Sequence, residues 1–232
     1  MSENILEKII SKKTEKIKEL QKTISVNDLA EKISSYKSYY NFKDKILNNL
    51  NNNRFSIIAE IKKASPSAGI IIENYDPVNI ANVYKANNVT CLSVLTEQDF
   101  FLGNLIHISK IKQKNNLPIL CKDFFIDKFQ VHLARSYGAD AILIILAGVT
   151  DEIAISLYEE AEKLKMSVIV EVHTVEEAKK ALKFQNAMIG INNRNLKTLK
   201  TDIKTTYDIC DVLSGHTGPL ISESGIKSKE EL

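Results

Sequence analysis

Residues 57–66 read Ile-Ile-Ala-Glu-Ile-Lys-Lys-Ala-Ser-Pro, an apolar run that ends with an acid and a base two positions apart. Side chains alternate between the two faces of a β-strand, so Glu60 and Lys62 would point to the same side. An acid and a base that face one side at the end of a strand indicate a functional site there. A structural salt bridge is the alternative interpretation.

Polar residues follow four later apolar runs in the same way, at the point where each run ends. They are Lys122-Asp123-Phe124, Glu171, Asn192-Asn193-Arg194 and Glu223-Ser224-Gly225. If these runs are parallel strands of a barrel, their carboxyl ends meet at one face of it. The pattern predicts one site assembled from many strands, and it requires Glu60, Lys62, Lys122 and Glu171 to converge in one cavity.

Apolar runs alternate with amphipathic segments from Phe55 onward. We expect strands near residues 55–62, 89–95, 118–124, 141–145, 167–172, 188–193 and 219–224, and helices near 77–87, 103–115, 127–137, 151–164, 174–184 and 202–213. Repeated strand–helix units predict a parallel sheet, and strands that are apolar almost throughout predict a sheet covered on both faces. The spacing favours an α/β fold of the (β/α)₈ TIM barrel type.

The predicted barrel has one unit too few. We expect an N-terminal helical extension over residues 1–53 and a barrel over 54–232, with the eighth βα unit lacking at the C-terminus. The first and seventh strands would then be unpaired edges, which proteins normally cover or charge. Either the full-length product is longer or a partner closes the gap. The lysines between residues 12 and 22 are expected on a solvated helix face.

The composition is that of an ordinary globular protein. The chain has 232 residues, 44% of them hydrophobic, and a net charge of +2, which gives no sign of a nucleic-acid surface. No apolar stretch approaches the ~20 residues of a membrane helix, so we expect a cytoplasmic protein that acts on a small molecule. Cys91, Cys121 and Cys210 lack metal-ligand spacing, which predicts reduced thiols and no metal site.

Lys122 and Glu171 are the strongest candidates for proton transfer. Burial at the end of an apolar run should depress the pKa of Lys122 unless nearby carboxylates restore it. Burial should raise the pKa of Glu171, whereas neighbouring lysines should lower it. An acid and a base on different strands suit proton transfer at a carbon skeleton, although a structural role for Lys122 fits the sequence equally well. His173 shares the face of Glu171, and no role for it follows from the sequence.

Ligand-binding candidates surround these residues. Asn192 and Arg194 offer an amide and a guanidinium fork suited to a carboxylate or a phosphate, or they form a polar turn. The small-residue segments 65–69 and 224–225 could direct backbone N–H groups toward a phosphate. Two aromatic pairs follow the second and third predicted strands, Phe100-Phe101 and Phe124-Phe125. They could line the binding site of an aromatic ligand, or they could equally belong to the core.

A series of segments, in a fixed order along the chain, carries a family resemblance. They are Ala59-Glu-Ile-Lys-Lys-Ala-Ser-Pro-Ser, Ser93-Val-Leu-Thr-Glu, Phe101-Leu-Gly, Pro118-Ile-Leu-Cys-Lys-Asp-Phe, Gly138-Ala-Asp-Ala-Ile-Leu, Val170-Glu-Val-His, Ile189-Gly-Ile-Asn-Asn-Arg-Asn-Leu and Ser222-Glu-Ser-Gly-Ile. Together with the helical N-terminus, these segments resemble indole-3-glycerol phosphate synthase, a (β/α)₈ lyase of tryptophan biosynthesis.

The resemblance implies closure of the indole ring of 1-(2-carboxyphenylamino)-1-deoxyribulose 5-phosphate, with loss of carbon dioxide and water and without a metal or organic cofactor. Lys122 would protonate the ketone oxygen as the ring carbon attacks. Lys62 would hold the substrate carboxylate and is a second candidate acid for dehydration. Glu171 would be a base or stabilise positive charge on the ring nitrogen, and Glu60 would orient the lysines. Asn192 completes the implied catalytic set.

The resemblance also implies which residues surround the substrate. Those that position it or pack its aromatic ring are Arg194, Glu223, Ser224, Phe101, Phe124 and Leu143, and those that bind its phosphate are Ser65 and Gly225. The N-terminal helices would partly cap the barrel mouth. The resemblance also implies an eighth strand followed by a Gly-Ser turn, and we expect residues 1–232 to lack both. Some members continue into phosphoribosylanthranilate isomerase, so fusion to or association with that enzyme is one expected arrangement.

Two other interpretations stay open. Another sugar-phosphate barrel enzyme could use Lys62 or Lys122 to form a Schiff base with its substrate. A truncated relative could bind phosphate ligands, or scaffold a partner, without turnover.

Overall fold

A parallel β-sheet forms the centre of the chain. The computed structural model describes residues 5–36, 38–196, 198–228 and 231. These residues form a seven-stranded sheet in which the strands follow their order along the chain, and every neighbouring pair is parallel. The strands are β1 (Ile58–Ile61), β4 (Cys91–Leu95), β5 (Ile119–Lys122), β6 (Ala141–Ile145), β7 (Ser167–Val172), β8 (Met188–Asn192) and β9 (Leu220–Glu223). The predicted parallel α/β fold is confirmed.

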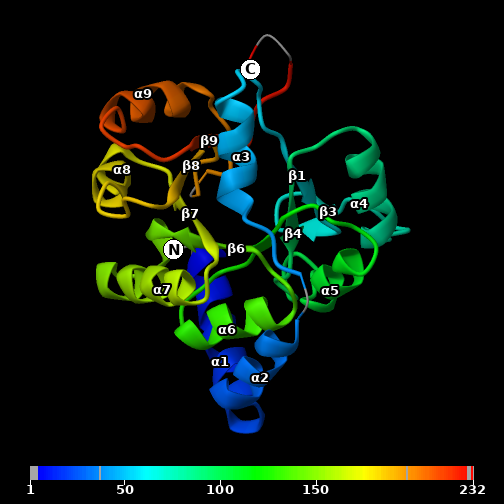
Figure 1. Cartoon of the computed structure of the whole chain (residues 1–232). Coiled ribbons are helices and arrows are strands. Elements are labelled where there is room, and N and C mark those ends of the chain that lie inside the picture. The colour runs from blue at the N-terminus through cyan, green and yellow to red at the C-terminus, as the bar shows by residue number, and fades with distance from the viewer. Residues whose placement is uncertain (1–4, 37, 197, 229–230, 232) are drawn as a thin grey trace.

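Helices connect successive strands and surround the curled sheet (Figure 1). They are α4 (Pro77–Ala86), α5 (Ile106–Lys112), α6 (Lys128–Ser136), α7 (Asp151–Lys163), α8 (Val175–Ala181) and α9 (Lys204–Val212), with a 3₁₀ turn, η1 (Leu146–Gly148), after β6. Three helices precede the sheet, α1 (Ile5–Thr23), α2 (Val26–Ser35) and α3 (Phe42–Leu50). Asp127 and Thr174 start α6 and α8 because each side chain accepts a first-turn N–H.

The helix expected over residues 103–115 is shorter, because α5 begins only at Ile106. Leu102 has a φ of 52°, and a Cβ on Gly103 would lie 2.4 Å from the carbonyl oxygen of Leu95. The chain therefore turns tightly against the end of β4 before the helix can start. Glycine fits this close approach because it has no Cβ.

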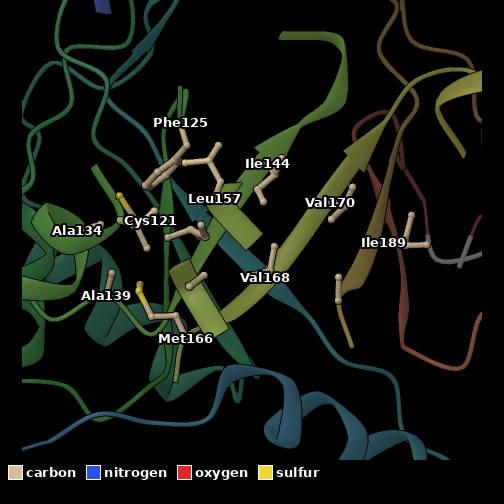
Figure 2. Close-up of a cluster of buried hydrophobic side chains, with 14 of the residues drawn as sticks. Cys121, Phe125, Ala134, Ala139, Ile144, Leu157, Met166, Val168, Val170 and Ile189 are labelled. Atoms are coloured by element: carbon tan, nitrogen blue, oxygen red, sulfur yellow. The ribbon is translucent and has the colours of Figure 1, made fainter. Parts of the chain in front are cut away.

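Two apolar layers line the two faces of the sheet. On β6, Ile142 and Ile144 point outward beneath the helices, whereas Leu143 and Ile145 point into the barrel. Figure 2 shows part of the outer layer, between the strands and the helices around them. Because side chains alternate, the strands from β1 to β8 in the sheet contribute to both layers, whereas β9 adds only Ile221, to the inner one.

Helix α3 closes the end of the barrel where the strands begin. Phe42 and Ile46 are buried in the inner layer, and the helix crosses the centre of the barrel in Figure 1. The main-chain N–H of Lys43 donates to Oγ of Ser167, at the start of β7 (3.1 Å). This N-terminal helix therefore covers the end opposite the predicted site, and the expected cap over the barrel mouth does not include it.

Helix α1 lies along loops at the carboxyl ends of the strands. Nζ of Lys13 is 2.6 Å from Oδ1 of Asp123, and Nζ of Lys16 is 2.7 Å from Oδ2 of Asp99. Lys13 is buried. The expectation of a fully solvated lysine face is therefore wrong at this position, because a carboxylate just after β5 holds the ammonium group inside.

The sheet does not close. Within the described residues, β1 and β9 are its two edges and do not pair with each other, as the count of seven strands predicts. Phe55 and Ile57 before β1, and Leu220 in β9, expose apolar surface along these edges. A short antiparallel hairpin, β2 (Ala64–Ser65) with β3 (Gly69–Ile70), follows β1 where the sequence indicated only a loop.

Residues 51–57 connect α3 to β1, so the predicted boundary between residues 53 and 54 falls in a connection, and we keep this division as a proposal. Across the described ranges, none of the helices has the length and apolar character needed to cross a membrane. The same residues contain no group of three His, Cys, Asp or Glu side chains that could hold a metal ion.

Candidate active site

Polar side chains occupy interior positions at the carboxyl ends of five strands. Lys122 and Glu171 face the same way as Leu120 and Ile169, two positions earlier, which belong to the inner apolar layer. The same alternation places three further side chains on this face, Glu60 of β1, Asn192 of β8 and Glu223 of β9. The structure thus brings residues from distant parts of the sequence to one end of the barrel.

Lys122 lies between two carboxylates. Its Nζ is 3.1 Å from Oε2 of Glu171 and 2.7 Å from Oε2 of Glu223. Burial alone lowers the pKa of Lys122, but the charges of Glu171, Glu223 and Glu60 together raise it above its ordinary value. The depression expected from burial is therefore reversed by the carboxylates, and Lys122 holds its proton at neutral pH.

Glu171 and Glu223 respond differently to the lysine they share. Burial opposes ionisation of Glu171, but Lys122 and His173 bring its pKa below the usual range. Nδ2 of Asn192 also donates to Oε1 of Glu171 (3.2 Å). Burial raises the pKa of Glu223 against the opposing charge of Lys122, and the charge of Glu171 adds to the rise. One carboxylate of the cluster therefore stays ionised, and the other takes up a proton more readily.

Glu60 and Lys62 form an ion pair at the end of β1. Their side chains are 36% and 29% exposed, so this pair is more accessible than the Lys122 cluster. Glu60 nevertheless acts electrostatically on both Lys122 and Glu223. The salt bridge weighed as an alternative is thus present, and it belongs to the same site.

Gly190 leaves the room that this cluster needs, and its importance was not apparent from the sequence. It lies in β8, paired with Glu171 of β7. A Cβ at Gly190 would lie 2.2 Å from Oε1 of Glu223 and 3.0 Å from Cγ2 of Ile169. The Glu223 carboxylate therefore occupies the space that a side chain at position 190 would fill, and this position allows it to contact Lys122.

His173 is a second residue that the sequence left without a role. Its Nε2 lies 3.2 Å from Oε1 of Glu171, which is an ion-pair distance without hydrogen-bond geometry. Oε2 of Glu177, on α8, accepts the main-chain N–H of His173 (2.8 Å) and lies 3.4 Å from its Nδ1. The spacing of two from Glu171 was the one signal that could have pointed to it.

Asn193 joins the loops that follow β8 and β9. Its Nδ2 donates to Oγ of Ser222 and to the carbonyl oxygen of Ser224, both at 3.0 Å. Ser224 and Gly225 have φ values of 67° and 81°, so the chain turns sharply just after Glu223. The two residues predicted to contact substrate and phosphate therefore lie directly beyond the cluster.

Two other predicted binding residues make contacts within their own loops. Nη1 of Arg194 donates to the carbonyl oxygen of Leu199 (3.1 Å). Because β8 ends at Asn192, the strand alternation used to place Arg194 on the same face does not extend to it. Oγ of Ser65 accepts the N–H of Ala68 (3.2 Å) in the β2–β3 hairpin.

Phe101 and Phe124 lie side by side after β4 and β5, with ring centroids 6.1 Å apart. Phe124 packs against the inner layer that contains Leu143. The carboxylate of Glu97 accepts the main-chain N–H groups of Phe100 (2.7 Å) and Phe101 (3.1 Å) and so fixes the loop that carries the first ring. The structure brings the predicted aromatic residues together, with a support that the sequence did not indicate.

Comparison with known proteins points to one family. The family model described as indole-3-glycerol phosphate synthase matches residues 6–232. A protein of that name from Prochlorococcus marinus subsp. pastoris is 43% identical over 236 residues, which cover 100% of this chain and 79% of the relative. Another, from Desulforamulus reducens, is 40% identical over 228 residues, which cover 98% of this chain and 85% of the relative.

Solved structures with low identity show likeness of fold alone. Tryptophan synthase subunit alpha from Legionella pneumophila str. Paris matches with a TM-score of 0.56 at 15% identity, over 82% of this chain and 80% of that one. A 3-keto-L-gulonate-6-phosphate decarboxylase from Vibrio cholerae matches with a TM-score of 0.54 at 14% identity, over 74% of this chain and 78% of that one.

Proposed function

This chain belongs to the indole-3-glycerol phosphate synthase family, and from that membership we propose that the cluster around Lys122 is its active site. The enzyme is a carboxy-lyase that closes the indole ring of 1-(2-carboxyphenylamino)-1-deoxyribulose 5-phosphate and releases carbon dioxide and water. The observation that supports the site most strongly is the Lys122 ammonium group, 3.1 Å from Glu171 and 2.7 Å from Glu223.

Lys122 is the proposed acid of the ring-closing step. The ring carbon that bears the carboxylate attacks the ketone carbon, and the carbonyl electron pair moves to oxygen, which takes the proton of Lys122. The bond to the carboxylate then breaks, and its electrons restore the aromatic ring as carbon dioxide leaves. The raised pKa keeps Lys122 protonated at neutral pH but also makes its ammonium group a weaker acid, so this role is supported by the position of Lys122 in the cluster and not by its pKa.

Glu171 is the proposed stabiliser of the positive charge that develops on the ring nitrogen. Its lowered pKa favours this electrostatic role over that of a base, because a carboxylate that resists protonation is a weak base. Lys62, paired with Glu60, is the proposed acid for the hydroxyl that leaves as water. The methylene group next to the nitrogen then releases a proton, which the neutral amine of Lys122 takes up, and the C–H electron pair forms the double bond of the indole. Glu60 orients Lys62.

The remaining predicted residues keep their predicted roles as proposals. Asn192 orients Glu171 through its hydrogen bond of 3.2 Å. The substrate is positioned by Arg194, Glu223 and Ser224, its ring packs on Phe101, Phe124 and Leu143, and its phosphate binds at Ser65 and Gly225. Arg194 and Ser65 would exchange their loop contacts for contacts with substrate.

The charge state of Lys122 also bears on the Schiff-base alternative. Attack on a carbonyl requires a neutral amine, and three carboxylates raise the pKa of Lys122. The test is direct: purified chain is incubated with the carboxyphenylamino substrate, and indole fluorescence is followed. We expect product to accumulate and borohydride to trap no substrate on lysine. Substrate-induced stabilisation without product would contradict the proposal and support a binding relative.

We expect Gly190→Ala to displace the Glu223 carboxylate from Lys122, because the new Cβ takes its place. Loss of this charge-assisted contact should lower kcat about tenfold, and overpacking should lower the free energy of unfolding by ~1–3 kcal/mol. Steady-state kinetics and urea denaturation measure these effects. Gly215→Ala is the matched control, since a Cβ there meets nothing within 4 Å. Equal losses in both variants would argue against the role of Gly190.

We further propose a cytoplasmic location, and fusion to or association with phosphoribosylanthranilate isomerase. Both proposals are supported by the family resemblance of the sequence. Gel filtration of the two purified enzymes, alone and mixed, tests the association: a shared peak is expected, and separate elution contradicts it.

A further inference from the structure

We propose that His173 is a positioning residue that acts as an imidazolium to hold Glu171 in its carboxylate form and turned toward Lys122, and that Glu177 keeps His173 charged. This inference rests on the proposed function of the Lys122 cluster. It extends that cluster by two residues for which neither the sequence motifs nor the proposed mechanism has a role.

Both ring nitrogens of His173 face carboxylate oxygens. Nε2 is 3.2 Å from Oε1 of Glu171, and Nδ1 is 3.4 Å from Oε2 of Glu177. The side chain of His173 is only 6% exposed, so water does not substitute freely for either partner. A neutral imidazole has one N–H, and its other nitrogen would direct a lone pair at a buried carboxylate. The imidazolium is the form that can serve both partners.

The surrounding charges favour the same form. Burial lowers the pKa of His173, but Glu171 of β7 and Glu177 on α8 outweigh burial and raise it to about 9. Lys122 of β5 and Asn192 of β8 both contact Glu171, so they influence the charge of His173 through that carboxylate. The η1 turn, which also packs against β7 and α8, contributes no titratable side chain.

This arrangement divides the two oxygens of Glu171. Oε2 faces Lys122, whereas Oε1 faces His173 and Asn192. When Lys122 gives its proton to the substrate, Glu171 loses the positive charge at Oε2. His173 then remains as the positive neighbour that keeps Glu171 ionised while charge develops on the substrate.

His173→Gln is expected to lower kcat about tenfold with little change in KM, and to move the acidic limb of the kcat profile up by about one pH unit. Glu177→Gln should give the wild-type rate below about pH 6.5, where His173 is protonated in any case, and a lower rate as pH rises. The matched control is His132→Gln. His132 forms a similar pair with Glu160 (2.8 Å), between α6 and α7, outside the site.

The controls separate a positioning role from a structural one. His132→Gln should keep the wild-type pH profile. Unchanged profiles in both His173→Gln and Glu177→Gln, even with lowered Tm, would overturn the inference. The folded-state pKa of His173, about 9, exceeds its ordinary value of 6.5. Its contribution to stability is therefore fully present below pH 6.5 and is lost as pH rises through 9, so the Tm difference between wild type and His173→Gln should shrink over that window.

An NMR titration of the wild-type imidazole groups tests the charge state without any variant or any turnover. We expect His173 to be protonated at pH 7 and to titrate near pH 9. A neutral His173 at pH 7 would overturn the inference whether or not the chain forms product. Failure of the proposed function alone would instead appear as no indole product with His173 still charged.

Discussion

Replacing Lys122 with methionine is expected to lower kcat by about 10³-fold in protein that remains folded. The substitution removes the proposed acid, and it also leaves Glu171 and Glu223 facing each other without the cation between them. Both carboxylates should then bind protons more readily, and His173 is left as the positive neighbour of Glu171. Indole fluorescence under saturating substrate measures the loss.

A companion variant makes this result specific. Lys122→Arg keeps a positive charge but delivers its proton far less readily, so we expect a loss of kcat nearly as large as in the methionine variant. Circular dichroism must show that each variant is folded at the assay temperature. A methionine variant that keeps more than a tenth of the wild-type kcat would remove Lys122 from the mechanism.

Lys112→Met is expected to lower the free energy of unfolding by about 3–5 kcal/mol, the largest stability effect we predict. Nζ of Lys112 lies 2.5 Å from Oδ2 of Asp140, and the two side chains are 3% and 0% exposed. Asp140 also accepts the main-chain N–H of Tyr40 (2.7 Å) and of Ile119 (2.8 Å). Burial raises the pKa of Asp140 and lowers that of Lys112, so each depends on the other to stay charged. Without Lys112, the buried carboxylate of Asp140 keeps only the more distant guanidinium of Arg135, whose Nη1 lies 4.0 Å from Oδ1.

Urea denaturation measures this loss, and Asp140→Asn in the same chain provides the control. The amide removes the stranded charge and keeps one oxygen, which can accept either the Tyr40 N–H (bonded to Oδ1 of Asp140) or the Ile119 N–H (bonded to Oδ2). The double variant should therefore recover part of the stability. The folded fraction of Lys112→Met should retain kcat within about twofold, because this pair lies at the strand beginnings, away from Lys122. A loss of stability below 1 kcal/mol would contradict the prediction.

The strands, their parallel order and the five interior polar positions could be predicted from the sequence. Each depends on local pattern: apolar runs mark buried strands, alternation fixes which side chains face inward, and carboxyl ends of parallel strands meet at one edge. Glu60, Lys122 and Glu171 follow from these rules alone. The rules stop where the strand stops, which is why Arg194, two residues beyond β8, lies against Leu199 in its own loop.

Only the tertiary structure decided how these groups are charged and how they fit together. The pKa of Lys122 is raised because Glu171 and Glu223 approach it from other strands, whereas burial alone would lower it. Gly190 matters because Glu223 needs the volume of its missing side chain, and Lys13 is buried because Asp123 lies beneath it. Alternation sets the direction of a side chain, but Coulomb energy and close packing depend on distances of a few ångströms between strands, which the folded chain alone fixes.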